Sequence, residues 1–393
     1  MIRDEGSNMK RAMRLAKFQD LDCAIHMMQL AIRSCLNSQE NIKGTKQKCK
    51  KISMHFNHST IAQTQLHKIQ DRLNQPNLKV FQDCVTRWNS TFYMLDRFLK
   101  VKDALSLYIN DSEIDLILPE EWKIIECLVD LLKPFEEATR ELSSSQTLIS
   151  SVISIIRMLT QKVSDYLAAT PVSPIYHAAT TLKAEISGKF STLLEEDNLY
   201  VIATYLDPRY KNKFFTSVSE ERIKEEILKI CRNTQDILVS RSISPRVKKM
   251  RMTDSMEIDT EQPGTSGTRR KSCLISDLAK MLDSSSDDES WETPEIVSPD
   301  AMLKKELHSF RNKKRISLNE NPLKWWSVNQ CELKLLSQIA RKFLSAPPAS
   351  VPSEQLFSEA GLIYTPLRNR LESEKAAILL FIKYNAPLFK FDY

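Results

Sequence analysis

Glycine is scarce in this sequence, with only 6 glycines among 393 residues. Loop-rich all-β folds need glycine at tight turns, so the scarcity argues against them and favours helices. The eight cysteines show no regular spacing, and we expect free thiols in a reducing compartment. No leader-like segment and no apolar run of about 18 residues is present, so we expect neither a signal peptide nor a membrane partner.

The length and the charge set broad limits on the fold and its partners. A chain of 393 residues can bury a sizeable core and suggests two or more folding units. The formal net charge of +6 is mildly basic. Such a charge permits nucleic acid as a partner but does not require it.

Helical spacing of apolar residues dominates most of the chain. Residues 24–36 place their apolar side chains on one face, and residues 105–233 are predicted to be nearly all helix. Residues 80–85 (VFQDCV) alternate well enough to predict a strand. Residues 240–300 have little apolar content and an acidic run, so the sequence predicts disorder there.

Residues 339–385 carry the densest run of helix signals. Ser353 can cap a helix that Gly361 ends, and a second helix is predicted from Ser373 until Pro387 stops it. The second helix is apolar nearly all round, so it must be buried inside the chain or against another copy. The residues that we expect at a contact between copies are Leu356, Phe357, Leu371, Ala377, Leu380, Phe381 and Tyr384.

Polar residues at fixed positions in this stretch carry a family resemblance. They read Pro352-Ser353-Glu354, Phe357-Ser358, Ala360-Gly361 and Leu367-Arg368-Asn369-Arg370-Leu371. This pattern resembles the C-terminal dimerisation region of hAT-type transposases. The resemblance implies self-association or pairing with related hAT proteins, with DNA as a further partner and no small-molecule substrate.

The resemblance also implies a metal site made of three carboxylates in an RNase H-like fold, where two divalent ions act on DNA. Asp4 matches the second of these carboxylates and Glu354 the third. The first has no counterpart in the three residues before Asp4. We therefore expect no cofactor, and Mg²⁺ at Asp4 and Glu354 only if a complete site forms. The plain alternatives are a solvated Asp4 and a Glu354 that stabilises the start of a helix.

Two further motifs resemble DNA-contacting elements of the family. Cys23 and His26 have C-x2-H spacing; zinc would need two more ligands, and a packed pair or a DNA-contacting helix is the preferred alternative. Arg87-Trp88 resembles the R-W-x-S-T motif, whose Trp can stack on an extruded base. A core Trp at the start of a helix is the equal alternative. The residues assigned to DNA binding are Arg87, Trp88, Cys23, His26, Arg368 and Arg370.

Family members often begin with a BED-type zinc finger, and the sequence has no cysteine and histidine spacing of that kind. Short basic clusters at 246–251 and 269–271 suit nuclear import, so we expect a nuclear protein. An equally plain role for these clusters is to keep the chain in solution.

The predicted fold is mostly α with a partial α/β RNase H-like core that an all-helical insertion splits. Its parts are the partial core (1–100), the helical insertion (101–239), a disordered linker (240–300), the rest of the insertion (301–334) and the dimerisation region that completes the core (335–393).

The predicted function is that of a domesticated or degenerate hAT transposase, N-terminally truncated, that retains dimerisation and weak DNA binding. One alternative is an active metal-dependent transposase or nuclease whose missing Asp comes from a longer gene product or a partner. The other is a regulatory chain that heterodimerises with full-length relatives.

Overall fold

The computed structural model describes residues 2–4, 6–17, 20–84, 86–110, 114–195, 199–242, 298–363 and 371–386. Helices dominate these residues, which confirms the mostly α-helical class that the sequence predicts. The predicted disordered linker lies almost entirely outside the described residues.

Regular strand pairing in the described part is confined to two short strands near the start. β1 (Ile2–Arg3) pairs in parallel with β2 (Leu21–Asp22), and Ile2 lies opposite Leu21. Helix α1 (Ser7–Ala16) connects them, and α2 (Ala24–Leu36) begins directly after β2.

The strand predicted at 80–85 is wrong for the residues that the structure describes there. Residues 80–84 form an irregular segment instead. The backbone N–H of Cys84 donates to Ser90 Oγ at 2.8 Å, and Asp83 Oδ1 accepts from Ser90 and Thr91, each at 2.7 Å. A side chain in the first turn of the following helix therefore pairs the backbone N–H of Cys84, which in a sheet a neighbouring strand would pair.

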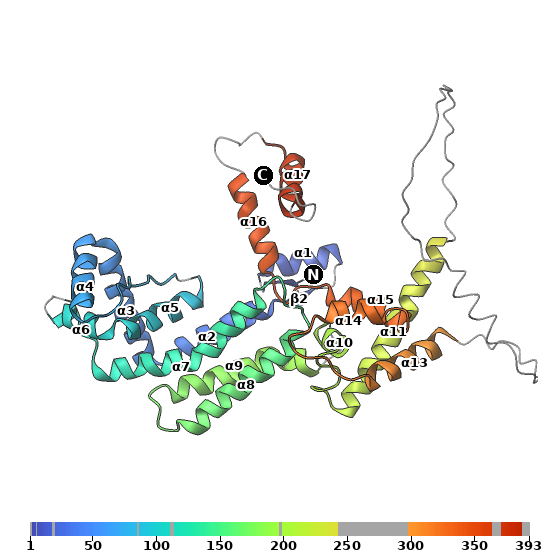
Figure 1. Ribbon diagram of the computed structural model, residues 1–393, viewed down its shortest axis with the longest axis horizontal. Coiled ribbons are helices and arrows are strands. Elements are labelled where there is room, and N and C mark those ends of the chain that lie inside the picture. The colour runs from blue at the N-terminus through green and yellow to red at the C-terminus, as the bar shows by residue number, and fades with distance from the viewer. Residues whose placement is uncertain are drawn as a thin grey trace, which may run out of the picture.

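Helices α3 to α9 form one end and the middle of the molecule. α2 and α8 both pack along α9, and α5 packs on α7 (Figure 1). Their bounds are α3 (Glu40–His58), α4 (Thr60–Arg72), α5 (Trp88–Lys100), α6 (Lys102–Asn110), α7 (Pro119–Leu142), α8 (Ser151–Ala169) and α9 (Tyr176–Glu195).

The other end is built around the short helix α10 (Leu199–Leu206), whose residues from Tyr200 onwards are all buried. α15 packs on α10 and α14, and the indole N–H of Trp326 donates to the carbonyl oxygen of Leu206 at 2.9 Å. Phe310 stacks on Trp326 with ring centroids 5.2 Å apart. The helices here are α11 (Ser217–Ser242), α13 (Pro299–Asn312), α14 (Pro322–Asn329) and α15 (Lys334–Leu344).

The last two helices, α16 (Val351–Ile363) and α17 (Ser373–Asn385), pack against each other and project from the rest of the molecule (Figure 1). The bounds of α17 agree with the predicted helix that starts at Ser373 and stops before Pro387. α16 runs from Val351 to Ile363, so Ser353 and Gly361 lie inside the helix and neither caps nor ends it as predicted.

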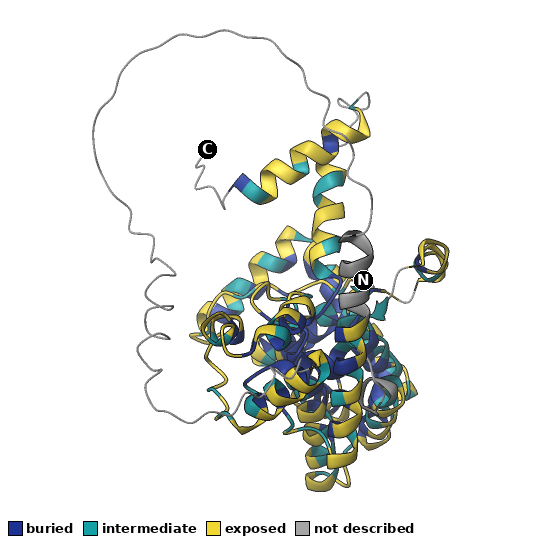
Figure 2. Ribbon diagram, turned by 90° about the vertical axis from the view of Figure 1, so that its right-hand side faces the viewer, coloured by how far each residue is buried: buried dark blue, intermediate teal, exposed yellow. Residues whose placement is uncertain are grey.

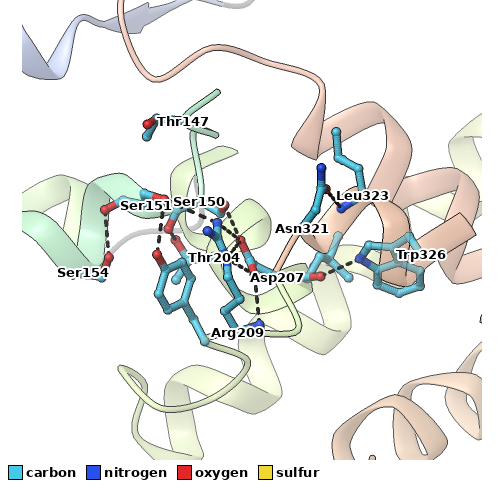
Figure 3. A network of polar contacts seen from close by, with 12 residues as sticks. Thr147, Ser150, Ser151, Ser154, Thr204, Asp207, Arg209, Asn321, Leu323 and Trp326 are labelled. Atoms are coloured by element: carbon cyan, nitrogen blue, oxygen red, sulfur yellow. Dashed lines mark hydrogen bonds and ion pairs between the residues drawn. The ribbon is translucent and has the colours of Figure 1, made fainter. Parts of the chain in front are cut away.

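A buried polar network lies in the turn after α10 (Figure 3). The carboxylate of Asp207 is fully buried. Its Oδ2 accepts from Ser150 Oγ at 2.6 Å and from Arg209 Nη2 at 2.7 Å, and its Oδ1 accepts from the Arg209 backbone N–H at 2.9 Å. Thr204 Oγ1 donates to the Ser150 carbonyl at 3.0 Å. The network joins the start of α8 to the end of α10.

Lys211, in the same turn, is a buried lysine with 2% of its surface exposed. Its ammonium donates to the carbonyl of Phe310 at 2.7 Å and to that of Lys313. Burial, followed by the charges of Lys313 and Arg315, lowers the pKa of Lys211 to about 8. In the unfolded chain the pKa returns to its ordinary value of 10.5.

This difference predicts a pH-dependent stability. Because the unfolded state holds the proton more tightly, the free energy of unfolding contributed by Lys211 rises with pH between the two pKa values. Relative to Lys211→Met, the wild type should gain about 2 kcal/mol between about pH 7.5 and 9.5. Urea unfolding of both proteins at the two pH values measures this. A difference that stays constant would show that the ammonium remains charged in the folded state.

Candidate functional site

The surface of α16 and α17 is apolar and exposed. Phe357 is 73% exposed and Phe381 is 68% exposed, and no residue of α16 is buried. In α17 only Ala376 is buried before the helix ends, and Figure 2 shows both helices mostly in the exposed colour. The exposed large apolar side chains of this pair are Leu356, Phe357, Leu362, Ile378, Leu379, Phe381, Ile382 and Tyr384.

The residues predicted for dimerisation fall largely on this surface. Leu356, Phe357, Ala377, Phe381 and Tyr384 are exposed. Leu371 and Leu380 are half-buried. Residues that the prediction left out, such as Leu362 and Ile378, are as open as those that it named. The sequence did not single out these residues, because the spacing of apolar residues does not show which face of a helix its neighbours cover.

The orientation of the helix pair is fixed at two places. Within the pair, Lys383 Nζ lies 2.9 Å from Glu359 Oε2. At the start of α16, Ser350 donates its backbone N–H to Cys23 Sγ at 3.4 Å and its hydroxyl to Glu354 Oε1 at 2.7 Å. Cys23 in turn donates its backbone N–H to the carbonyl of Arg3 at 2.7 Å. The first strand, the start of α2 and the start of α16 therefore meet at Cys23.

Asp4 and Glu354, the predicted remnant of a metal site, are both exposed. Asp4 Oδ1 accepts the backbone N–H of Gly6 at 3.1 Å. The two nearby aspartates, Asp20 and Asp22, are ion-paired with Arg3. Burial works against the Arg3 charge, but the hydrogen bonds and charges of these two aspartates outweigh it and raise the pKa of Arg3.

A divalent ion needs several oxygen ligands converging on one point. Within the described ranges, no group of three or more His, Cys, Asp or Glu side chains is arranged to hold a metal ion. The only predicted ligands are the exposed carboxylates of Asp4 and Glu354. The carboxylates of Asp20 and Asp22 near Asp4 are already paired with Arg3. These residues do not fit a magnesium site by themselves.

Cys23 and His26 lie at the start of α2, where Cys23 is buried and His26 is half-buried. His55, one of the two further ligands considered for zinc, is 2.8 Å from the hydroxyl of Tyr108 through Nε2. His58 lies at the last position of α3 and is exposed. Because these four residues, all of them described, do not gather into one group, the zinc alternative is wrong.

Trp88 is the first residue of α5 and is 3% exposed, with its ring 6.4 Å from that of Phe92. This burial favours the core alternative, because a base needs an open ring face for stacking. Arg87 just before it is exposed. Arg368 and Arg370, the other predicted DNA contacts, lie outside the described residues.

No helix in the described part of the chain combines the length and the apolar character that spanning a bilayer requires.

Comparison with known families gives two matches within the chain. Residues 302–386 match the hAT family C-terminal dimerisation region. Residues 21–131 match the ZBED1 RNase-like helical domain. The first match includes α16 and α17, which carry the exposed apolar surface.

The similar proteins include BED-type zinc finger proteins and transposases. Zinc finger BED domain-containing protein 4 of Homo sapiens is 26% identical over 396 residues, which cover 99% of this chain and 31% of the human protein. The Putative AC transposase of Zea mays is 27% identical over 381 residues, which cover 93% of this chain and 44% of the maize protein. The chain thus spans less than half the length of these relatives. It is a hAT-derived protein, related both to hAT transposases and to BED-type zinc finger proteins, and it carries the hAT C-terminal dimerisation region.

Proposed function

We propose that the main activity of this chain is self-association through α16 and α17, as a domesticated or degenerate member of the hAT transposase lineage. The observation that carries the proposal is the row of exposed apolar side chains on two projecting helices. Monomeric proteins seldom leave a contiguous apolar surface of this kind open, and stable dimer contacts are built from such surfaces. The family match over residues 302–386 supports the same activity.

We further propose that residues 1–100 and 335–393 form the remnant of an RNase H-like core. Residues 101–239 and 301–334 would then be a helical insertion, and 240–300 the linker between its halves. The support is the junction at Cys23, where hydrogen bonds join the first strand to the start of α16 across 327 positions of sequence between Cys23 and Ser350. The match of residues 21–131 to an RNase-like helical domain adds to this support.

Light scattering on the purified chain tests self-association. At tens of micromolar we expect a mass twice that of the chain, because the exposed surface of each copy becomes covered by the other. A monomer under these conditions contradicts the proposal. In that case, a complex formed only on addition of a full-length relative would favour the heterodimer alternative.

Loose DNA affinity in the nucleus is a second candidate function. Its support is the net charge of +6 together with exposed Arg87 beside a basic cavity. Such an affinity would be electrostatic, so it should fall steeply as salt is added. Fluorescence anisotropy with labelled duplex DNA at two salt concentrations measures it.

The enzyme alternative has its own expected outcome. With only Asp4 and Glu354 in place, we expect the chain alone to produce no nicks in plasmid DNA in the presence of Mg²⁺. Gel electrophoresis of the plasmid measures this. Cleavage that Glu354→Gln abolishes would instead favour an active nuclease.

A further inference from the structure

A basic cavity of about 430 Å³ lies between α2, α3 and the start of α5. Five cationic side chains line it, against the single carboxylate of Asp83. They come from three separate segments of the chain. These side chains are Arg33, Lys43, Lys46, Lys50 and Arg87.

Only part of this charge is balanced by the carboxylate in the cavity. Lys50 Nζ lies 2.5 Å from Asp83 Oδ2. Burial pushes the pKa of Asp83 upward, but hydrogen bonds from Lys50, Thr91 and Ser90 outweigh it and leave the pKa below its ordinary value. Asp83 is therefore ionised at neutral pH and paired with Lys50. Lys43 is paired with Glu40, which does not line the cavity, and Arg33 donates to the carbonyl of Thr86 at 2.7 Å. This leaves Lys46 and Arg87 as the lining cations that form no ion pair among the described residues.

Lys46 is held at the cavity by neutral oxygen atoms. Its ammonium donates to Asn37 Oδ1 at 2.9 Å and to the Leu36 carbonyl at 3.5 Å. Burial, followed by the charge of Lys50, lowers the pKa of Lys46. A bound anion would remove this unfavourable crowding of like charges.

Trp88 supplies a second, independent observation. Its side chain lines the same cavity and is 3% exposed, and its indole N–H has no hydrogen-bond acceptor among the residues that the structure describes. A buried N–H without an acceptor costs free energy, which an oxygen atom of a ligand or of a water molecule beside the ring would remove. Cations and a neutral N–H donor together suit the oxygen atoms of a phosphate group.

We propose that this cavity binds the phosphate groups of a single nucleic-acid strand, with Lys46 and Arg87 as the principal contacts. The inference rests on the proposed nucleic-acid affinity and gives it a place and a chemical group. The phosphates of a duplex lie on a convex surface and can reach only the rim of a cavity. A single strand can bend into one, and grooves lined by cations hold such strands by their backbone.

The test compares two double variants of the full chain in binding a labelled oligothymidine of about 16 nucleotides. Lys46→Gln with Arg87→Gln removes two cations from the cavity. Lys51→Gln with Lys68→Gln removes two exposed cations from α3 and α4 that do not line it. Circular dichroism confirms that each variant is folded. Since Arg87 is exposed, Arg87→Gln alone replaces the first variant if that variant does not fold.

We expect the cavity variant to bind at least about tenfold more weakly and the matched control to stay within about threefold. The dependence of log affinity on log salt should become shallower by about 1.4 in the cavity variant, at roughly 0.7 for each phosphate that the protein no longer neutralises. Inorganic pyrophosphate should compete with the oligothymidine for the wild type.

Three outcomes would overturn the inference. Equal weakening by both double variants would mean diffuse charge rather than a site. A failure of pyrophosphate to compete would exclude a phosphate site, and a duplex bound as tightly as the single strand would exclude strand selectivity. Duplex binding that persists in the cavity variant would leave the general DNA affinity standing without this site.

Discussion

Replacing Phe357 and Phe381 by glutamate is expected to turn the proposed dimer into a monomer. Each phenylalanine is mostly exposed on its own copy, so its contacts must come from the partner. Buried aromatic side chains at the centre of an interface contribute about 2 kcal/mol or more each. Because each copy loses both side chains, four are removed from the interface, and the dissociation constant should rise about a millionfold. Analytical ultracentrifugation over a concentration series measures the change.

The matched control for this substitution is Val172→Glu, because Val172 is an apolar residue in the turn between α8 and α9 that is even more exposed than the two phenylalanines. The control should leave the dimer intact. Circular dichroism of the double glutamate variant should show unchanged helix content, since neither phenylalanine is in the core of its own chain. Unfolding or aggregation of that variant would mean that the two side chains face the core of one copy, and would contradict the proposed interface.

Asp207→Ala is expected to destabilise the fold by about 3–5 kcal/mol, the range seen when one partner of a buried ion pair is removed. The substitution leaves the guanidinium of Arg209 largely buried without its carboxylate. It also removes the acceptor of the Ser150 hydroxyl, which holds the start of α8 against the end of α10. The shift in the urea midpoint, followed by far-ultraviolet circular dichroism, gives the loss.

A surface carboxylate provides the comparison for Asp207. Asp96 pairs with Lys100 one helical turn away, and both side chains reach solvent. Such a pair contributes about 0.2–1 kcal/mol, so Asp96→Ala should shift the midpoint little. Similar losses for the two variants would show that the Asp207 network has no special weight in the stability of the fold.

The sequence was sufficient to predict the local helical structure of this protein. The start at Ser373 and the apolar spacing of residues 24–36 each act within a few residues, and helices form at both places. A helix also forms around Ser353, but it begins at Val351, so Ser353 lies inside it and is not its cap. The strand at 80–85 failed because its alternating pattern holds equally for an extended loop. Tertiary structure decides whether residues 80–84 pair with a strand or with side chains, and here they pair with the side chains of Ser90 and Thr91.

The candidate sites show the same limit. The sequence assigns Arg87 to DNA binding, but Arg33 and Lys46 appear there as ordinary solvated charges, and nothing in the sequence links the three. Only the packing of α2, α3 and α5 brings them to one cavity. The exposed face of α16 and α17 was also undecided, because a helix that is apolar all round looks the same beside a core and beside a second copy.

The junction at Cys23 has a consequence for how this chain tolerates change. The start of α16 is hydrogen-bonded through Ser350 to Cys23, and Cys23 is hydrogen-bonded to Arg3. The direction in which α16 and α17 project therefore depends on Arg3 and Cys23. A lesion among those residues would tilt the pair and misalign two copies without touching a single side chain between them. The alignment of two copies would then depend on residues that lie outside the contact between them.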